Sequence, residues 1–225
     1  ECEAGITRRE GNTYSLTTQF PQCLGGKMTA SKNGYHPSSF EVDTNQEGLV
    51  NIPLEAYYEL PVEIIVDDEG TLRTPYGTES ILFQFEIEDQ EFFTTYYYPS
   101  TEKLKLIAGN YHITATLMVE TDGGFNFPER EIEICSEVPK RGIGGIVGLT
   151  ETKCTQQTID PMELEAVVAG GGSTTWNADR RVLATSNKIT LYTYRGKTPN
   201  TFEELNNVYT SQGQFSKNMR NPTFE

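Results

Sequence analysis

The residues of this chain with the clearest chemical potential are its four cysteines, Cys2, Cys23, Cys135 and Cys154. A thiol can ligate a metal, act as a nucleophile or pair in a disulfide. None of the four lies in a Cys-x-x-Cys pair, and no histidine stands at zinc-ligand spacing from them, so no metal site is expected. The even number, divided into an N-terminal and a C-terminal pair, favours two local disulfides.

Four cysteines allow three connectivities. We predict Cys2–Cys23 and Cys135–Cys154, because each bond closes a loop of about 20 residues and contributes roughly 3 kcal/mol in the chain-entropy model. The alternative is four reduced, buried thiols. Disulfides persist in oxidising compartments, so the predicted pairing indicates an extracellular or cell-surface protein.

His36 and His112 are the two histidines, and both are candidates for acid–base chemistry. A Ser–His–acid triad could use His36 with Ser38 or Ser39, but no Gly-x-Ser-x-Gly motif is present. We interpret both histidines as surface or core-rim residues. The sequence therefore predicts no catalytic residue and no cofactor, and we expect a protein that is not an enzyme.

Two glycine-rich runs need an interpretation. Residues 142–148 have nearly the spacing of a dinucleotide-binding loop, but Val147 stands where the third glycine belongs and no strand–helix context surrounds it. We predict that this run and 170–172 are flexible joints. Within the first run, Ile143 and Ile146 could belong to a contact surface.

An aromatic run occupies residues 92–98, whose five rings are Phe92, Phe93, Tyr96, Tyr97 and Tyr98. Neighbouring side chains in a strand point to opposite faces of the sheet, so these rings cannot all face one core. Either an interdomain seam covers the second face, or the exposed rings form an interface or a ligand platform.

Composition narrows the possible partners. The 225 residues include 18 Lys and Arg against 32 Asp and Glu, which gives a net charge of −14. Such a chain cannot neutralise a phosphate backbone, so nucleic acid is excluded as a partner. No segment approaches the ~18 apolar residues of a membrane span. The 12 Tyr and 11 Phe argue against a disordered chain.

Alternating polar and apolar residues indicate β-strands at intervals of about ten residues, which is typical of sandwiches and barrels. The strands expected are 13–20, 27–31, 49–54, 60–66, 81–87, 92–98, 104–107, 111–119 and 129–134. Residues 108–110 are expected to be a hairpin turn. The fold class predicted is all-β, with tandem small β-sandwich domains and one short helix, 198–207, near the C-terminus.

We divide the chain into three segments. Residues 1–57 and 58–136 are predicted to be β units, and 137–225 a β-rich segment with the short helix and a polar tail that forms an arm or part of a strand. Domains below about 80 residues bury little core, so disulfides or neighbouring domains are expected to support them.

The first segment resembles a known family. The runs GKMTASKNGY (26–35), FEVDT (40–44) and GLVNIPL (48–54) are similar to carboxypeptidase-regulatory-like and PEGA modules. That resemblance implies a non-catalytic, transthyretin-like β-sandwich of secreted and cell-surface proteins. Residues 58–136 are similar to an immunoglobulin-like sandwich in their strand rhythm, although no Cys…Trp…Cys core is present.

These observations predict a secreted or cell-surface structural protein that acts through self-assembly, as a filament or surface layer, or through adhesion. Open edge strands permit assembly by strand addition. The partners expected are copies of the chain or another surface protein. The alternative is a carbohydrate-binding accessory module that uses the exposed aromatic residues.

Overall fold

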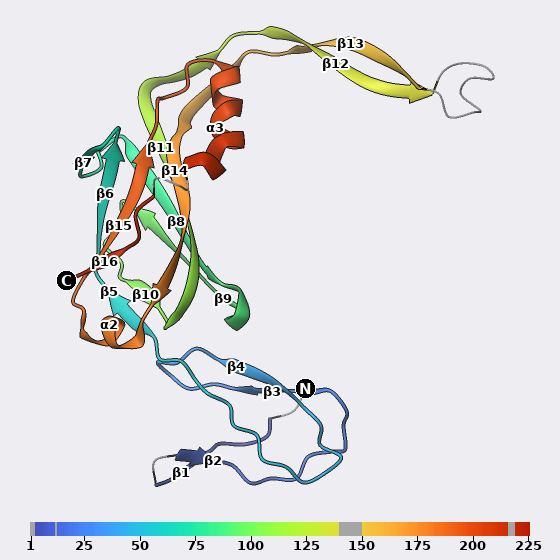
Figure 1. Cartoon of the computed structure of the whole chain (residues 1–225), viewed down its shortest axis with the longest axis vertical. Coiled ribbons are helices and arrows are strands. Elements are labelled where there is room, and N and C mark those ends of the chain that lie inside the picture. The colour runs from blue at the N-terminus through green and yellow to red at the C-terminus, as the bar shows by residue number, and fades with distance from the viewer. Residues whose placement is uncertain (1–2, 12, 140–149, 216–218) are drawn as a thin grey trace.

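The computed structural model describes residues 3–11, 13–139, 150–215 and 219–225. It contains an N-terminal region of short hairpins, a central sandwich and a two-stranded arm that leads away from the sandwich (Figure 1). The prediction of an all-β fold with a short helix near the C-terminus is confirmed.

The N-terminal region, residues 3–57, consists of two hairpins. β1 (Arg8–Glu10) pairs with β2 (Thr13–Ser15), and β3 (Gly26–Ala30) pairs with β4 (Ser38–Val42). None of its described side chains is buried. The strand expected at 49–54 does not form, because Pro53 offers no backbone N–H and only the neighbouring Tyr35–Ala56 bridge pairs this stretch.

The N-terminal region contacts the sandwich through hydrogen bonds and through the rings of His36 and Tyr57, which both lie near Phe92. The His36 Nε2 donates to the carbonyl oxygen of Gln90 at 3.1 Å, and the His36 Nδ1 lies 3.2 Å from the Tyr57 hydroxyl. The Arg180 guanidinium donates to both carboxylate oxygens of Glu55, at 2.6 and 2.7 Å. These contacts attach a region in which no described side chain is buried.

The sandwich is built from one sheet with the strand order β7-β6-β15-β14-β11-β8-β9, with β16 paired to β15. The strands are β6 (Val62–Asp68), β7 (Thr71–Arg73), β8 (Glu79–Ile87), β9 (Phe92–Tyr98), β11 (Gly109–Phe127), β14 (Met162–Ala178), β15 (Ile189–Arg195) and β16 (Thr223–Phe224). β14 and β15 share only the pair Gly170–Arg195, and β15 runs parallel to β6. The two halves of the sheet therefore enclose one core.

Alternate side chains of the strands fill this core. On β8, Ile81, Phe83 and Phe85 are fully buried, and on β11 Ile113 and Leu117 join them. Burying side chains of this size stabilises the fold by about 1.5–3 kcal/mol each. The period-2 pattern of the sequence is thus the pattern of burial.

The expected hairpin around residue 109 does not form. β10 (Leu104–Leu106) pairs with β5 (Tyr58–Leu60), whereas β11 pairs with β8 and β14. The Tyr111 hydroxyl accepts from the Ile107 amide at 3.0 Å and donates to the Ile107 carbonyl at 2.9 Å. Those bonds occupy backbone groups that a hairpin ladder would need, so the chain turns a corner there. Pro61 similarly divides the single strand expected at 60–66 into β5 and β6.

The glycines at 170–172 form a buried part of β14, so the prediction of a flexible joint there is wrong. A Cβ on Gly170 would lie 2.2 Å from the Tyr194 carbonyl oxygen. A Cβ on Gly171, whose φ is +136°, would lie 2.2 Å from the Ala115 carbonyl oxygen. These glycines allow neighbouring backbones to approach closely.

The sheet combines strands from both sides of the segment boundary placed after residue 136. β14 and β15 come from 137–225, and they pair with β11 and β6 from 58–136. Local strand rhythm cannot reveal such long-range pairing, because the pairing depends on register between distant residues.

Two α-helices lie in the described residues. α3 (Phe202–Phe215) begins beyond Thr201, whose hydroxyl accepts from the Glu204 amide at 3.2 Å, and its Leu205 packs with Phe127 and Val167. α2 (Arg180–Thr185) was not predicted, and a short 3-10 helix covers Glu88–Gln90. The predicted polar tail ends in a strand, because β16 pairs with β15.

Candidate interaction surfaces

The arm consists of β12 (Arg130–Pro139) and β13 (Thr150–Ile159), paired antiparallel along their whole length. In the described part of the chain these two strands pair only with each other. None of their described side chains is buried, and the arm leaves the sandwich near α3 (Figure 1). The arm therefore offers two strand edges and two faces to a partner.

The ladder is interrupted where the arm meets the sandwich. Phe127 and Met162 are the last pair of the β11–β14 ladder, and the arm ladder starts at Arg130. Pro128 and Pro161 lie in the gap, and a proline donates no ladder hydrogen bond. A hollow of about 310 Å³ lies here, lined by Asn126, Phe127, Pro128, Pro161, Met162 and Glu163. Its single titratable residue does not make a catalytic set.

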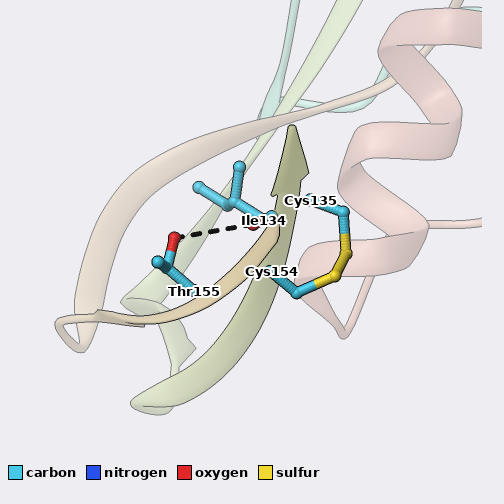
Figure 2. Close-up of a disulfide and its surroundings, with 4 residues drawn as sticks. All are labelled: Ile134, Cys135, Cys154 and Thr155. Carbon is cyan, nitrogen blue, oxygen red and sulfur yellow. Dashed lines mark hydrogen bonds between the residues drawn. A yellow bond between two sulfur atoms is a disulfide. The ribbon is translucent and has the colours of Figure 1, made fainter. Parts of the chain in front are cut away.

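Cys135 and Cys154 form the predicted disulfide across the arm, with their Cα atoms 4.0 Å apart (Figure 2). They face each other in the ladder register. Both are exposed, so the alternative of buried thiols is wrong for this pair. Cys23 is also exposed. Its expected partner Cys2 lies outside the described residues, so that bond stays a prediction.

The glutamate next to the disulfide adds a possible metal ligand. The Glu133 carboxylate and the two cysteine sulfurs lie within 4.8 Å of one another. The sulfurs are bonded to each other, and only free thiolates bind metals strongly. The oxidised arm therefore offers one carboxylate at this position, not a ligand set.

Charge is distributed unevenly between the two strands of the arm. β12 carries Glu131, Glu133 and Glu137 on the face that also holds Cys135. β13 carries no charged residue from Cys154 to its end, where its sequence is Cys-Thr-Gln-Gln-Thr-Ile. The exposed edge of β12 is thus acidic, whereas the edge of β13 is neutral over six residues.

The aromatic strand β9 lies at one end of the sheet order. Phe92 and Tyr96 are buried in the core and Tyr98 is half-buried, whereas Phe93 is 58% exposed and Tyr97 is 49% exposed. The structure thus separates the five rings that the sequence grouped as one platform. Ile143 and Ile146, the other predicted contact residues, lie outside the described residues.

The outward side of β9, β8, β11 and β14 forms a regular grid, which we call the outer face. Its first row is Phe93, Glu86, His112 and Thr175; its second is Thr95, Gln84, Thr114 and Ser173; its third is Tyr97, Leu82, Thr116 and Gly171. Gln84 and Glu86 alternate with the buried residues of β8, and the strand register joins them to Phe93 and His112.

Neither histidine hydrogen-bonds to a serine or a cysteine in the described residues. His36 contacts Tyr57 and Gln90, whereas the Ser39 hydroxyl bonds to that of Thr29 at 2.8 Å. His112 lies exposed on the outer face. The described residues therefore contain no histidine paired with a serine or cysteine nucleophile.

A buried carboxylate, Glu79, lies inside the sandwich between two arginines. Both Glu79 oxygens accept from the Arg73 guanidinium at 2.8 Å, the Arg195 guanidinium also donates to Glu79, and the Tyr76 amide adds a bond of 2.8 Å. Burial alone raises the pKa of Glu79, but the bonds from Arg73, Tyr76 and Arg195 outweigh burial and lower it. No local motif in the sequence indicates this cluster.

The fold and these surfaces define an all-β, sandwich-like protein with a disulfide-linked arm. Comparison of the chain with protein-family models, curated proteins and solved structures found no match. Among the described residues, no helix is long and apolar enough to cross a membrane.

Proposed function

We propose that this chain is a non-catalytic extracellular or cell-surface structural protein that assembles with copies of itself through the open edge of β13. The observation that carries the proposal is an exposed strand edge, on a projecting arm, that carries no charged residue from Cys154 to Ile159. An unpaired edge presents N–H and C=O groups that pair readily with another strand, and such addition is a recurring mode of recognition.

The arm has the properties of a preformed edge. A two-stranded hairpin alone is marginally stable in water, and none of the described side chains of this one is buried. The Cys135–Cys154 bond holds the strands in register instead. A partner strand would then meet an ordered ladder, so little conformational entropy is lost on pairing.

The two edges differ in a way that selects one of them. Natural edge strands avoid unwanted pairing by carrying charge, and β12 carries Glu131, Glu133 and Glu137. β13 lacks this protection between Cys154 and Ile159. In a chain of net charge −14, a neutral edge is also where like-charge repulsion between copies is smallest.

The disulfide supports the proposed extracellular location, because such bonds persist outside reducing compartments. The hydrogen bonds from Tyr111 back to Ile107 resemble the tyrosine corner of immunoglobulin-like domains, and they support that assignment for the sandwich. We also propose that residues 26–54 form a carboxypeptidase-regulatory-like module, which is typical of secreted and cell-surface proteins.

Sedimentation velocity over a range of protein concentrations tests the assembly. The double variant Gln156→Glu/Gln157→Glu adds two charges to the β13 edge. The matched control, Gln19→Glu/Gln22→Glu, adds the same two charges at exposed positions of the N-terminal region. We expect association of the native chain, at least about tenfold weaker association of the arm variant, and native behaviour of the control. A native chain that stays monomeric, or an arm variant that associates normally, contradicts the proposal.

A further inference from the structure

We infer that the outer face binds a neutral oligosaccharide chain, independently of assembly through the arm. Three rows of residues on four strands form this face, and its one glycine, Gly171, is buried. With strand rise and spacing taken from ordinary sheets, the grid measures about 13 Å along the strands and about 14 Å across them. A surface of this size accommodates several sugar rings.

Charge is nearly absent from the outer face. Glu86 is its only acidic residue and it has no Lys or Arg, whereas 22% of the whole chain is charged. A ligand that carried charge would find no partner of opposite sign here beyond Glu86 and His112. The face therefore suits a ligand whose polarity comes from hydroxyl groups.

The centre of the grid is rich in hydrogen-bonding groups that the described chain does not use. Gln84, Glu86 and His112 are exposed, Thr114 and Thr116 are half-exposed, and none of these five side chains has a hydrogen-bond partner within the described residues. Amide, carboxylate, imidazole and hydroxyl groups together supply donors and acceptors. Sugar hydroxyls, which both donate and accept, match such a mixed set.

Phe93 and Tyr97 supply the apolar part of the site. They stand two rows apart on β9, at 58% and 49% exposure, which places their Cα atoms about 13 Å apart. The C–H face of a pyranose ring packs against an aromatic ring, while the Tyr hydroxyl remains free for a polar contact. The two rings would therefore hold separate residues of one saccharide chain.

The arrangement argues for a saccharide rather than a protein partner. Protein interfaces have an apolar centre surrounded by a polar rim. On the outer face the order is reversed, because Phe93 and Tyr97 occupy the edge strand whereas Gln84 and Thr114 lie in the centre. A protein docked here would bury polar groups at its centre, which costs free energy unless each one is paired.

Affinity electrophoresis and titration calorimetry test the inference, with soluble β-1,4-glucan, α-glucan, galactomannan and xylan as probes. We expect the native chain to bind at least one of them. Phe93→Ala and Tyr97→Ala should each weaken that binding about tenfold, equivalent to about 1.4 kcal/mol. Gln84→Ala should weaken it less, by about fivefold, because it removes a single hydrogen bond.

Two controls separate this site from other effects. Tyr14→Ala removes a ring of similar exposure, 56%, from the N-terminal region, and should leave binding within twofold of native. The Gln156→Glu/Gln157→Glu variant should also bind as the native chain does, even if assembly is lost. Absence of binding to all four probes, or equal binding by the Phe93, Tyr97 and Tyr14 variants, overturns the inference. If Tyr97→Ala abolishes binding to a protein partner but leaves saccharide binding unchanged, the inference is also overturned.

Discussion

The sandwich and the arm are made from the same kind of element but are stabilised in different ways. β11 and β14 lead into β12 and β13 (Figure 1), and both pairs are antiparallel. In the sandwich, alternate side chains are buried in a shared core, whereas the arm buries none that the structure describes. The arm depends on its ladder and one disulfide. A strand pattern alone therefore does not decide whether a strand supports the fold or is presented to a partner.

The largest expected effect concerns the buried carboxylate of the sandwich. Glu79→Gln should lower the free energy of unfolding by about 3–5 kcal/mol, because it leaves the partly buried Arg195 without its carboxylate partner and Arg73 with Asp68 alone. Urea unfolding followed by circular dichroism measures the change. Glu133→Gln is the matched control in the arm, where the side chain is exposed, and it should change stability by less than about 0.5 kcal/mol. If the two substitutions change the unfolding free energy equally, the sandwich and the arm are not stabilised in different ways.

The same residue type can be removed from each region. Ile113 is fully buried, whereas Ile134 is 45% exposed on β12. Ile113→Ala should cost about 2–5 kcal/mol through lost burial and a residual cavity, and Ile134→Ala should cost less than about 0.5 kcal/mol. Thermal and urea unfolding of both variants provide the comparison. If Ile134→Ala proves as costly as Ile113→Ala, the arm has a core that this structure does not contain.

The sequence predicts strands best where the alternation of polar and apolar residues within one short segment is enough to define the strand. The strand expected at 92–98 coincides with β9, and 81–87 differs from β8 only at its start. The Cys135–Cys154 bond was also predictable, because loop length alone favours a local pair. In each case the decisive information lies within about 20 residues of sequence.

Prediction fails where distant residues decide. Gly170 and Gly171 weaken local strand propensity, yet close approach to Tyr194 and Ala115 requires them inside β14. Arg195 reaches Glu79 across 116 positions, and no local spacing signals that contact. The outer face needs the register of four strands before its rows become visible. Long-range register is set by packing, so sequence periodicity leaves it open.

Reduction of the disulfide should affect the arm and spare the sandwich. The Cys135–Cys154 bond closes a short loop, so its loss should destabilise the arm by about 3 kcal/mol in the chain-entropy model. The interruption at Pro128 and Pro161 separates the arm ladder from the sandwich ladder. Hydrogen exchange should therefore accelerate in β12 and β13 and remain slow in β8 and β11. Cys135→Ser/Cys154→Ser should reproduce the result without reductant, and faster exchange throughout the sandwich would contradict it.

The smallest expected effect is a pH dependence of the unfolding free energy that arises from Glu79 in the sandwich. The bonds from Arg73, Tyr76 and Arg195 lower the folded-state pKa of Glu79 despite its burial. A carboxylate with a lowered folded-state pKa stabilises fully above its unfolded pKa of about 4.3, and this contribution is lost as pH falls through the folded-state value. The difference in unfolding free energy between the native chain and Glu79→Gln should therefore be constant from pH 7 to about pH 5 and narrow below it.

Urea unfolding of both proteins at a series of pH values measures that difference, and the Glu133→Gln variant supplies the reference. Because Glu133 is exposed on the arm, its difference from the native chain should stay small at every pH. A Glu79→Gln difference that stays constant in acid, or widens, would mean that the arginines do not hold Glu79 ionised in the folded chain. The pH profile then separates a buried charge cluster, which supports the core, from an exposed acid on β12.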